Sequence, residues 1–312
     1  MFGVRLLYHG KVLFFAGIFL LAIFISSINI AISQFGAGLE IKTGVYFLNV
    51  GQGDSILIIT KQKQIILIDT GSPLGKLIPE LKKILSDDIK RIDILILTHP
   101  DADHDGDVVS LVKHFNIGLV LHSPIYFLRE DGLLTLQNFN KTLPVFAGVN
   151  LQFSENESLD FLSPGMLSEN VFDAPLFSKK EIEDNNFFSA VSSFKTFDKN
   201  FLLMADAPIK IEKVLVDNMI ENGFVKTIFN DMSIRQNILK AGHHGSKTSS
   251  AEEFVKKINP TDVIFSYGKN NRYKHPSKEI EEMFQEVFPK TKIHRTTEGT
   301  VYFGDVISSN AD

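Results

Sequence analysis

The residues of this chain that can do chemistry begin in one short loop, which directly follows an apolar run at 92–97. Two imidazoles and two carboxylates occur there within six residues, at His99, Asp101, Asp103 and His104. This donor set suits Zn²⁺ or, because it is rich in oxygen, Mn²⁺. In a tight loop His99 and Asp101 can face one ion while Asp103 and His104 face another. The spacing therefore allows two adjacent divalent metal ions.

Two later stretches carry donors of the same kinds. Asp206 follows the apolar run 201–204, so we expect it at the end of a strand. Its alternative role is to cap a helix, because Ala207-Pro208 and an amphipathic pattern come next. The adjacent His243 and His244 lie on a glycine-flanked turn and can point in opposite directions, one to a metal and the other to substrate.

Candidate substrate-binding residues surround the histidine pair. Ser246 and Lys247 follow it directly, and a basic loop at 268–276 contains Arg272 and His275. Such a loop with one aromatic residue suits a phosphate beside a stacked base, although by itself it is also typical of a solvated surface. Lys247, Arg272 and His275 are candidates to neutralise phosphate or to protonate a leaving oxygen.

Three separated motifs carry a family resemblance, and they occur at 49–55, 98–107 and 239–249. Together they resemble the metallo-β-lactamase superfamily, whose HxHxDH signature appears here with Asp101 in place of the second histidine. Over about 45–303 the chain is similar to the hydrolase domains of ComEC-type DNA-uptake channel proteins. The resemblance implies an α/β fold, a four-layer αββα sandwich, with two metal ions, Zn or Mn. The metal ligands that it implies are His99, Asp101, Asp103, His104, a bridging Asp206, and His243.

Other assignments follow from the same resemblance. Asp103 and Asp206 hold the metal cluster, and Asp69 accepts hydrogen bonds that orient the ligand loop. His244 is the alternative metal ligand to His243. If His243 is the ligand, His244 is a catalytic candidate together with His275. Ser246 joins Lys247 and Arg272 in contacting substrate.

The sequence departs from the superfamily pattern in two places. No histidine lies between His122 and His243, where the superfamily often has another metal ligand. Water, Asn185, Asn186 or His122 itself is expected to complete the weaker metal site. In addition, residues 204–206 read Met-Ala-Asp where Thr-Gly-Asp is usual.

The elements that must position these residues alternate between strands and helices. Strand-like segments at 45–50, 55–60 and 64–68 suit a hairpin meander, and the run 92–97 should be a buried parallel strand. Apolar residues at helical spacing predict helices that cover the sheets. Further strands are expected at 117–121, 149–153, 158–162, 187–196, 200–205, 238–241 and 263–267, helices at 74–86, 108–115, 207–222 and 277–287, and a final hairpin from 292–295 and 300–303.

Composition limits the chemistry and the partners. The chain of 312 residues has no cysteine, which excludes thiolate metal sites and leaves histidines and carboxylates as ligands. The net charge of −5 argues against a general nucleic-acid coating surface. However, residues 240–295 contain 11 Lys and Arg against 7 Asp and Glu. A polyanion such as DNA can be received on that side.

The N-terminal 1–33 can be read in two ways. Arg5 and Lys11 precede an apolar stretch at 12–32 that is long enough to span a bilayer as a helix, which predicts a signal anchor. Small residues at Ala31 and Ser33 alternatively suit cleavage of a signal peptide. Both interpretations place the following domain outside the cytoplasm, either membrane-anchored or secreted. We expect a linker at 34–44, one hydrolase domain at 45–306 and a tail at 307–312.

These features predict a hydrolase that uses two metal ions to activate water against a phosphodiester, with DNA or a nucleotide as the expected substrate. A phosphorylcholine-type esterase or a lactonase would use the same metals on another substrate. A third hypothesis is a membrane-tethered module that binds DNA without cutting it. The chain has at most one membrane-spanning segment, so we do not expect it to be a complete uptake channel, and it could act alone or beside a separate channel subunit.

Overall fold

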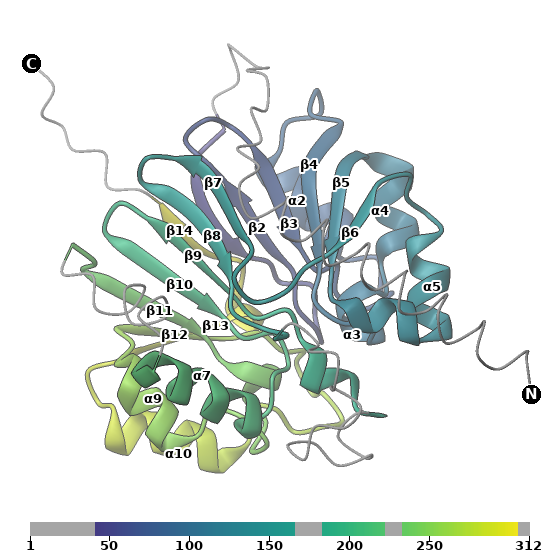
Figure 1. Cartoon of the computed structure of the whole chain (residues 1–312). Helices are drawn as coiled ribbons and strands as arrows, with labels where there is room; N and C mark the ends of the chain where they lie inside the picture. Colours follow the sequence, from purple (N-terminus) through teal and green to yellow (C-terminus); the bar gives the residue numbers. More distant parts are fainter. Residues whose placement is uncertain (1–40, 166–182, 222–232, 305–312) are drawn as a thin grey trace, which may run out of the picture.

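The computed structural model describes residues 41–165, 183–221 and 233–304. Two seven-stranded sheets lie face to face, and helices cover the outer face of each (Figure 1). The expected αββα sandwich is therefore confirmed for this part of the chain.

The first sheet has the strand order β14-β1-β2-β3-β4-β5-β6. Its strands β1, β2 and β3 form an antiparallel meander, as expected, and β3 to β6 run parallel. The strands are β1 (Gly44–Phe47), β2 (Ile56–Ile59), β3 (Ile65–Ile68), β4 (Arg91–Leu97), β5 (Asn116–His122), β6 (Thr142–Pro144) and β14 (Val301–Gly304).

The second sheet has the order β13-β12-β11-β10-β9-β8-β7. Here β7 to β10 are antiparallel, and β10 to β13 are parallel. The strands are β7 (Asn150–Ser154), β8 (Glu157–Phe161), β9 (Ser192–Thr196), β10 (Lys199–Leu203), β11 (Gln236–Lys240), β12 (Asp262–Phe265) and β13 (Lys292–Arg295). Parallel strands β4, β10 and β11 thus bring their carboxyl ends to one edge of the sandwich.

Helices flank both sheets. Helices α2 (Leu77–Ile84) and α4 (Val108–His114) cover the first sheet, and α7 (Ile209–Glu221), α9 (Glu252–Ile258) and α10 (Lys278–Val287) cover the second (Figure 1). Two short helices, α3 (Ala102–Asp105) and α5 (Glu130–Leu136), lie between strands of the first sheet in chain order. Four 3₁₀ turns complete the elements: η1 (Pro124–Leu128), η2 (Asn185–Phe188), η3 (Gly242–Gly245) and η4 (Thr296–Glu298).

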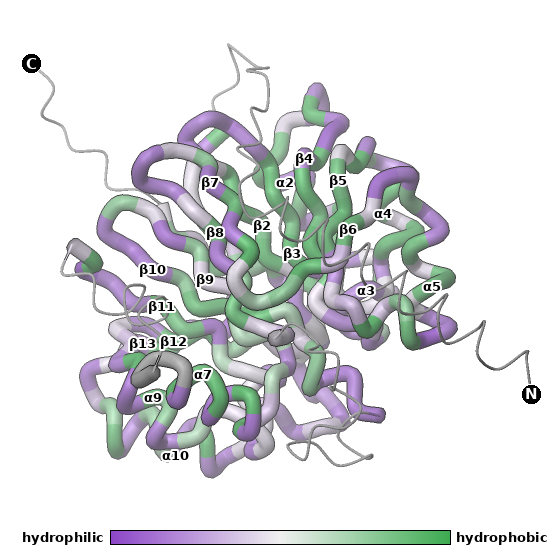
Figure 2. The backbone as a smooth tube through the Cα atoms, viewed as in Figure 1, coloured by the Kyte–Doolittle hydropathy of each residue, from purple (hydrophilic) through white to green (hydrophobic). Residues whose placement is uncertain are grey.

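The core has three apolar layers, and β4 shows how they are built. Ile94 and Ile96 point between the two sheets, whereas Leu95 and Leu97 point toward the covering helices. A strand buried on both faces must be apolar throughout, which explains the run at 92–97. Figure 2 shows the same contrast between hydrophobic strands and hydrophilic loops.

Two expectations about the strands were wrong. The predicted final hairpin does not form, because β13 pairs with β12 in the second sheet and β14 pairs with β1 in the first. Gly299, with φ of +137°, lies in the connection, and Val301 and Phe303 pack against the layer between the sheets. The strand expected from 187 begins only at Ser192, because 185–188 form the turn η2.

The boundary predictions fall partly outside the described residues. The segment at 1–33 and the tail at 307–312 are not described. Strand β1 begins at Gly44, inside the expected linker. Among the residues described, no helix combines the length and the apolar character needed to cross a bilayer.

Candidate metal centre

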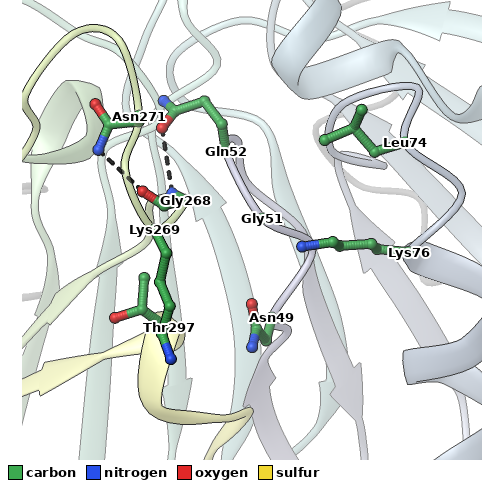
Figure 3. A pocket seen from close by; sticks show the side chains of 9 residues that line it. All are labelled: Asn49, Gly51, Gln52, Leu74, Lys76, Gly268, Lys269, Asn271 and Thr297. Carbon is green, nitrogen blue, oxygen red and sulfur yellow. Dashed lines mark hydrogen bonds between the residues drawn. The ribbon is translucent and has the colours of Figure 1, made fainter.

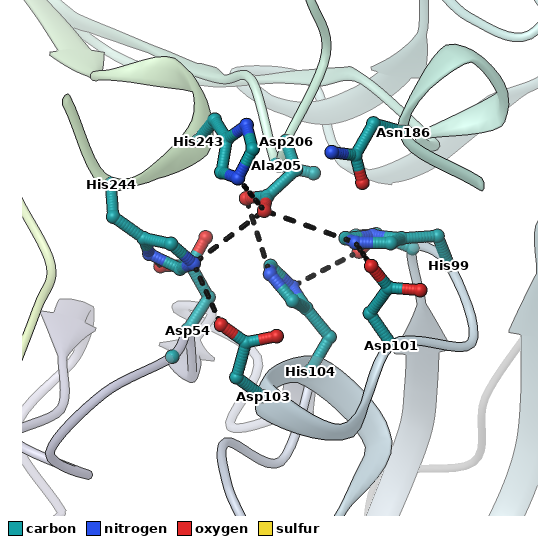
Figure 4. Close-up of polar contacts among 12 residues, drawn as sticks. Asp54, His99, Asp101, Asp103, His104, Asn186, Ala205, Asp206, His243 and His244 are labelled. Carbon is teal, nitrogen blue, oxygen red and sulfur yellow. Dashed lines mark hydrogen bonds and ion pairs between the residues drawn. The ribbon is translucent and has the colours of Figure 1, made fainter. Parts of the chain in front are cut away.

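The candidate site lies where the chain leaves three strands and enters a fourth. His99, Asp101, Asp103 and His104 follow β4, Asp206 follows β10, and His243 and His244 follow β11, while Asp54 precedes β2. Figure 4 shows these side chains pointing toward one another. The tertiary structure thus gathers donors that are far apart in the sequence.

Three overlapping groups of side chains bring their ligand atoms within 4.8 Å of one another. His104 Nε2 lies 3.1 Å from Asp206 Oδ1, and His244 Nε2 lies 3.5 Å from Asp206 Oδ2 and 3.2 Å from Asp103 Oδ2. Asp206 is at the centre of the arrangement. The three groups are His99, His104 and Asp206; Asp103, His104 and His244; and Asp54, Asp206 and His244.

The ligand atoms themselves fit a metal. Nε2 of His99, His104 and His244 and Oδ1 of Asp206 are all buried, and apart from their contacts with one another and with the carboxylates of the cluster none of them has a hydrogen-bond partner. Buried polar atoms are nearly always paired, so convergent unpaired nitrogens and oxygens indicate a cation site. Imidazole and carboxylate are the ligands of zinc or manganese centres that contain no cysteine.

Asp69 orients the ligand loop through two hydrogen-bonded neighbours. Its Oδ2 lies 2.7 Å from His104 Nδ1 and accepts a hydrogen bond from Thr98 Oγ1 at 2.7 Å, while Oδ1 accepts from the Thr98 backbone N–H. This contact occupies one nitrogen of His104 and leaves Nε2 to face Asp206. Carboxylates in this position fix the tautomer and the ring of a ligand histidine.

Asp101 lies at the margin of the cluster. Its Oδ2 is 3.7 Å from His99 Nε2, and Oδ1 accepts a hydrogen bond from Asn185 Nδ2 at 2.6 Å. Asp101 belongs to none of the three groups, and its side chain is 39% exposed. Asn185 therefore holds Asp101, and the adjacent Asn186, which Figure 4 draws with the cluster, has a buried and unpaired Oδ1.

His122 does not join the cluster. It is fully buried, and its Nδ1 lies 2.8 Å from the backbone oxygen of Ser123. Its ring lies edge-on to Phe127, with the centroids 4.8 Å apart. His122 belongs to none of the three groups, and its Nε2 is buried without a hydrogen-bond partner.

The two adjacent histidines have different environments. His244 is buried and belongs to two of the three groups, and its Nδ1 lies 2.8 Å from the backbone oxygen of Ser266. His243 belongs to none, its side chain is 28% exposed, and its Nε2 lies 3.6 Å from Asp206 Oδ2. The geometry therefore favours His244 as the ligand, where the resemblance suggested His243.

Sequence reasoning missed Asp54 and Lys240 as parts of the site. Asp54 Oδ1 lies 3.3 Å from His244 Nδ1, and the other oxygen of Asp54 pairs with the ammonium of Lys240. Asp54 ends the Gly-Gln-Gly-Asp turn, and Lys240 ends β11. Their positions inside two of the three motifs are the signal that could have pointed to them.

The backbone at the site adopts an uncommon conformation at four residues. Asp69, Ala205, His243 and His244 have φ values of +58°, +47°, +44° and +55°. Left-handed conformations cost residues with a Cβ roughly 1–3 kcal/mol each and cluster at functional sites. For Ala205, this conformation explains why glycine, which is usual in the superfamily, suits the position.

Charges within the site shift the pKa values strongly. Burial acts to lower the pKa of His104, but the carboxylates of Asp206 and Asp69 outweigh it and hold that pKa well above its usual value. Burial acts to raise the pKa of Asp206, but His244 and His104 hold it well below its usual value. Burial lowers the pKa of His99 to about 3. Protons and a metal ion would compete for these atoms.

The expected substrate-binding residues lie around the cluster. Lys247 and Arg272 are exposed, whereas Ser246 is buried and its hydroxyl contacts Thr248 Oγ1 at 2.9 Å. The ring of His275 lies 5.4 Å from that of His243 and stacks at 6.2 Å on that of His244.

Comparisons with known proteins agree with this geometry. The model of the Metallo-beta-lactamase superfamily matches residues 48–269. ComE operon protein 3 of Bacillus subtilis is 29% identical over 77% of this chain and 30% of its own length. Competence protein ComA of Neisseria gonorrhoeae is 26% identical over 78% of this chain and 29% of its own length. The chain thus spans less than a third of the length of these curated relatives.

A solved structure shows the same fold. Igni18, described as a novel metallo hydrolase from the archaeon Ignicoccus hospitalis, superposes with a TM-score of 0.51 at 14% identity, over 85% of this chain and 100% of its own. The family model covers more than half of the chain and includes most of the candidate ligands. The chain belongs to the metallo-β-lactamase superfamily.

Proposed function

We propose that this protein is a metal-dependent phosphodiesterase that cuts DNA or a related nucleotide polymer. The observation that carries the proposal is the convergence of His99, His104, His244 and Asp206, whose buried ligand atoms have no hydrogen-bond partner outside the cluster. Similarity to competence proteins favours a nucleic-acid substrate over a lactone or a choline ester.

The ligand set divides into two overlapping halves. His99, with Asp101 at the margin, would hold one ion, and Asp103, His104 and His244 would hold the second, while Asp206, which has two carboxylate oxygens, would contribute to both. Two divalent ions bound there would supply an activated water and stabilise charge on the phosphoryl oxygens. Asp69 and Asn185 keep His104 and Asp101 in the required orientation.

The loop at 268–276 supplies groups that suit a nucleotide. The ring of Tyr273 is half exposed and stacks on His275, with the centroids 5.7 Å apart. The guanidinium of Arg272 lies 4.7 Å from the centroid of the Tyr273 ring and donates a hydrogen bond to the Tyr273 hydroxyl. A base can stack on Tyr273 while Arg272 and Lys247 approach the phosphates.

Location and partners belong to the same proposal. We propose that the segment at 12–32 places the hydrolase domain outside the cytoplasm, where it would meet incoming DNA beside a separate channel subunit. Protease digestion of intact cells checks the topology, because an external domain is degraded and a cytoplasmic one is protected.

The activity is tested with the purified full chain in added Mn²⁺ or Zn²⁺. The substrates are plasmid DNA, oligonucleotides, bis-p-nitrophenyl phosphate, p-nitrophenyl phosphorylcholine and a lactone panel. We expect phosphodiester hydrolysis that Asp206→Ala or Asp103→Ala reduces by at least about 10³-fold, because the metal cluster is lost. Asp217→Ala, at an exposed position on α7, is the matched control and should retain full activity.

Other outcomes would redirect the assignment. Turnover of lactones or of the phosphorylcholine ester alone would move the protein to another hydrolase class. Single-strand binding without turnover in either metal would favour a DNA-binding module. Full activity of Asp206→Ala would refute the proposed centre.

A further inference from the structure

A pocket of about 290 Å³ lies between the turn that contains Gln52 and the loop at 268–276 (Figure 3). Two exposed lysines, Lys76 and Lys269, approach it from opposite sides. Four neutral side chains that can donate hydrogen bonds also line it, Asn49, Gln52, Asn271 and Thr297. No carboxylate lines the pocket, so its lining has a charge of +2.

Both lysines are available to a ligand. Within the described ranges neither Lys76 nor Lys269 forms an ion pair or a hydrogen bond through its ammonium group. The Lys76 ammonium lies against Gly51, where a Cβ would come within 3.2 Å of it. One further donor is unsatisfied, because Gln52 Nε2 is buried without a partner.

The nearest acidic residue along α2 is already compensated. Glu80 lies one turn beyond Lys76, forms a salt bridge with Lys83 and accepts a hydrogen bond from Thr300 Oγ1 at 2.7 Å. The positive charges of the pocket are therefore not cancelled by this neighbour.

Two loops connect the pocket directly to the metal centre. In the first, Gln52 lines the pocket, and Asp54, two residues later, reaches His244. Two residues of chain span at most about 7 Å. Gly53 fits between them because a Cβ there would lie 2.0 Å from the carbonyl oxygen of Asp103.

The second loop has a comparable arrangement. Asn271 Nδ2 donates to the backbone oxygens of Gly268, at 3.0 Å, and of His275, at 2.7 Å. The side-chain Oδ1 of Asn271 accepts a hydrogen bond from the His275 N–H at 2.9 Å. The same side chain thus lines the pocket and fixes His275 against the histidines of the metal centre. The two loops also contact each other, because the Gly268 N–H donates to Gln52 Oε1 at 3.2 Å.

We propose that this pocket is a second phosphate subsite, in which Lys76 and Lys269 bind a backbone phosphate of a nucleic-acid strand whose scissile bond lies at the metal centre. This inference rests on the proposed function. The pocket and the centre share two loops, so a bound strand would contact them at phosphates only a few nucleotides apart. The enzyme would then prefer oligonucleotides over diesters that contain a single phosphate.

The test uses the full chain and the double variant Lys76→Gln/Lys269→Gln. The matched control is Lys113→Gln/Lys257→Gln, which removes the same charge from exposed positions on α4 and α9. Fluorescence anisotropy measures the affinity for a labelled single-stranded oligonucleotide over a range of salt concentrations. Hydrolysis of bis-p-nitrophenyl phosphate is measured in parallel.

We expect the pocket variant to bind the oligonucleotide about tenfold more weakly, as two exposed ionic contacts would account for. The slope of log affinity against log salt concentration is negative, and it should become less steep by about 1.4, which corresponds to two lost phosphate contacts on a single strand. The control should change neither quantity. Hydrolysis of the small diester should keep its kcat in both variants, because that substrate does not reach the pocket.

The outcomes separate the subsite from the function. Equal oligonucleotide affinity and salt slope in the two double variants, or no binding by the wild type, would overturn the subsite, even if the diester is hydrolysed. Loss of affinity in the pocket variant alone supports the subsite, even if no diester is cut. A competition experiment adds inorganic phosphate at millimolar concentration. If phosphate displaces the oligonucleotide from the control variant but not from the pocket variant, the result also supports the subsite. Tight binding of free phosphate that the pocket substitutions abolish, without any effect on the oligonucleotide, would assign the pocket to a free anion instead.

Discussion

The ammonium group of Lys240 is completely buried and pairs with the carboxylate of Asp54, whose Oδ1 lies 3.3 Å from His244 Nδ1. Lys240 Nζ also donates to the backbone oxygen of Ala205, next to Asp206. One buried cation thus joins the ends of strands β10 and β11 to the turn that precedes β2. A pair of this kind fixes the geometry of the candidate metal centre more than it adds to stability.

Breaking this pair should destabilise the protein. We expect Lys240→Met to lower the free energy of unfolding by about 3–5 kcal/mol, because Asp54 is left buried without its counter-charge. The double variant Asp54→Asn/Lys240→Met should lose less than the sum of the two single variants, with a coupling of at least about 1 kcal/mol. Urea denaturation of the metal-free protein measures all four. Strict additivity would contradict a direct pair.

The two adjacent histidines should differ in metal binding. Because His244 is buried among Asp54, Asp103 and Asp206, His244→Ala should lower the bound metal from two ions to one or fewer. His243→Ala should retain both ions, since His243 belongs to none of the groups. Elemental analysis of the dialysed proteins gives the stoichiometry, and circular dichroism checks the fold. The reverse pattern would make His243 the ligand.

The Asp69→Asn substitution should weaken metal binding without removing a ligand. An asparagine side chain cannot accept from Thr98 and hold His104 Nδ1 in the same way as the carboxylate, so the His104 ring loses its fixed orientation. We expect a metal affinity roughly 10–100-fold weaker, as is typical when the partner of a ligand histidine is changed. Competition with a chelating dye measures it, and Asp131→Asn at an exposed position on α5 serves as the control. An unchanged affinity would leave Asp69 with a purely structural role.

A buried glutamate outside the metal centre should make stability depend on pH. Glu212 on α7 accepts hydrogen bonds from the backbone N–H groups of Ser250 and Ala251, and burial raises its pKa from 4.5 to about 7. Between these values the folded state holds the proton more tightly than the unfolded state does. The contribution of Glu212 to the free energy of unfolding is therefore complete below pH 4.5 and is lost as pH rises through 7.

This contribution can be isolated with one variant. The shift corresponds to an upper limit of about 3 kcal/mol. Glutamine resembles the protonated glutamate side chain. The Glu212→Gln variant should therefore lack the fall in the free energy of unfolding that the wild type shows between pH 4.5 and 7. Urea denaturation in EDTA at about pH 5 and pH 7 gives the difference, and the exposed Glu253→Gln should leave the decline unchanged. Equal declines in the wild type and Glu212→Gln would show that Glu212 does not titrate in this range.

The sequence by itself determined most of the strands and helices and the loop that bears the ligands. The apolar run at 92–97 identifies a strand buried on both faces, and the dense set of donors after it is a local pattern. Asp206 follows a similar run at 201–204. These signals are readable because residue order alone places such donors at the carboxyl ends of strands.

Only the tertiary structure decided how these donors meet. The left-handed backbone of His243 and His244 buries the ring of His244 in the cluster and leaves the ring of His243 partly exposed beside Asp206, and no local pattern encodes that difference. Asp54 and Lys240 pair across sheets, and the separation of β13 from β14 depends on which sheet offers an open edge. These features arise from contacts between segments distant in the chain, whose burial and pairing become defined only when the two sheets pack together.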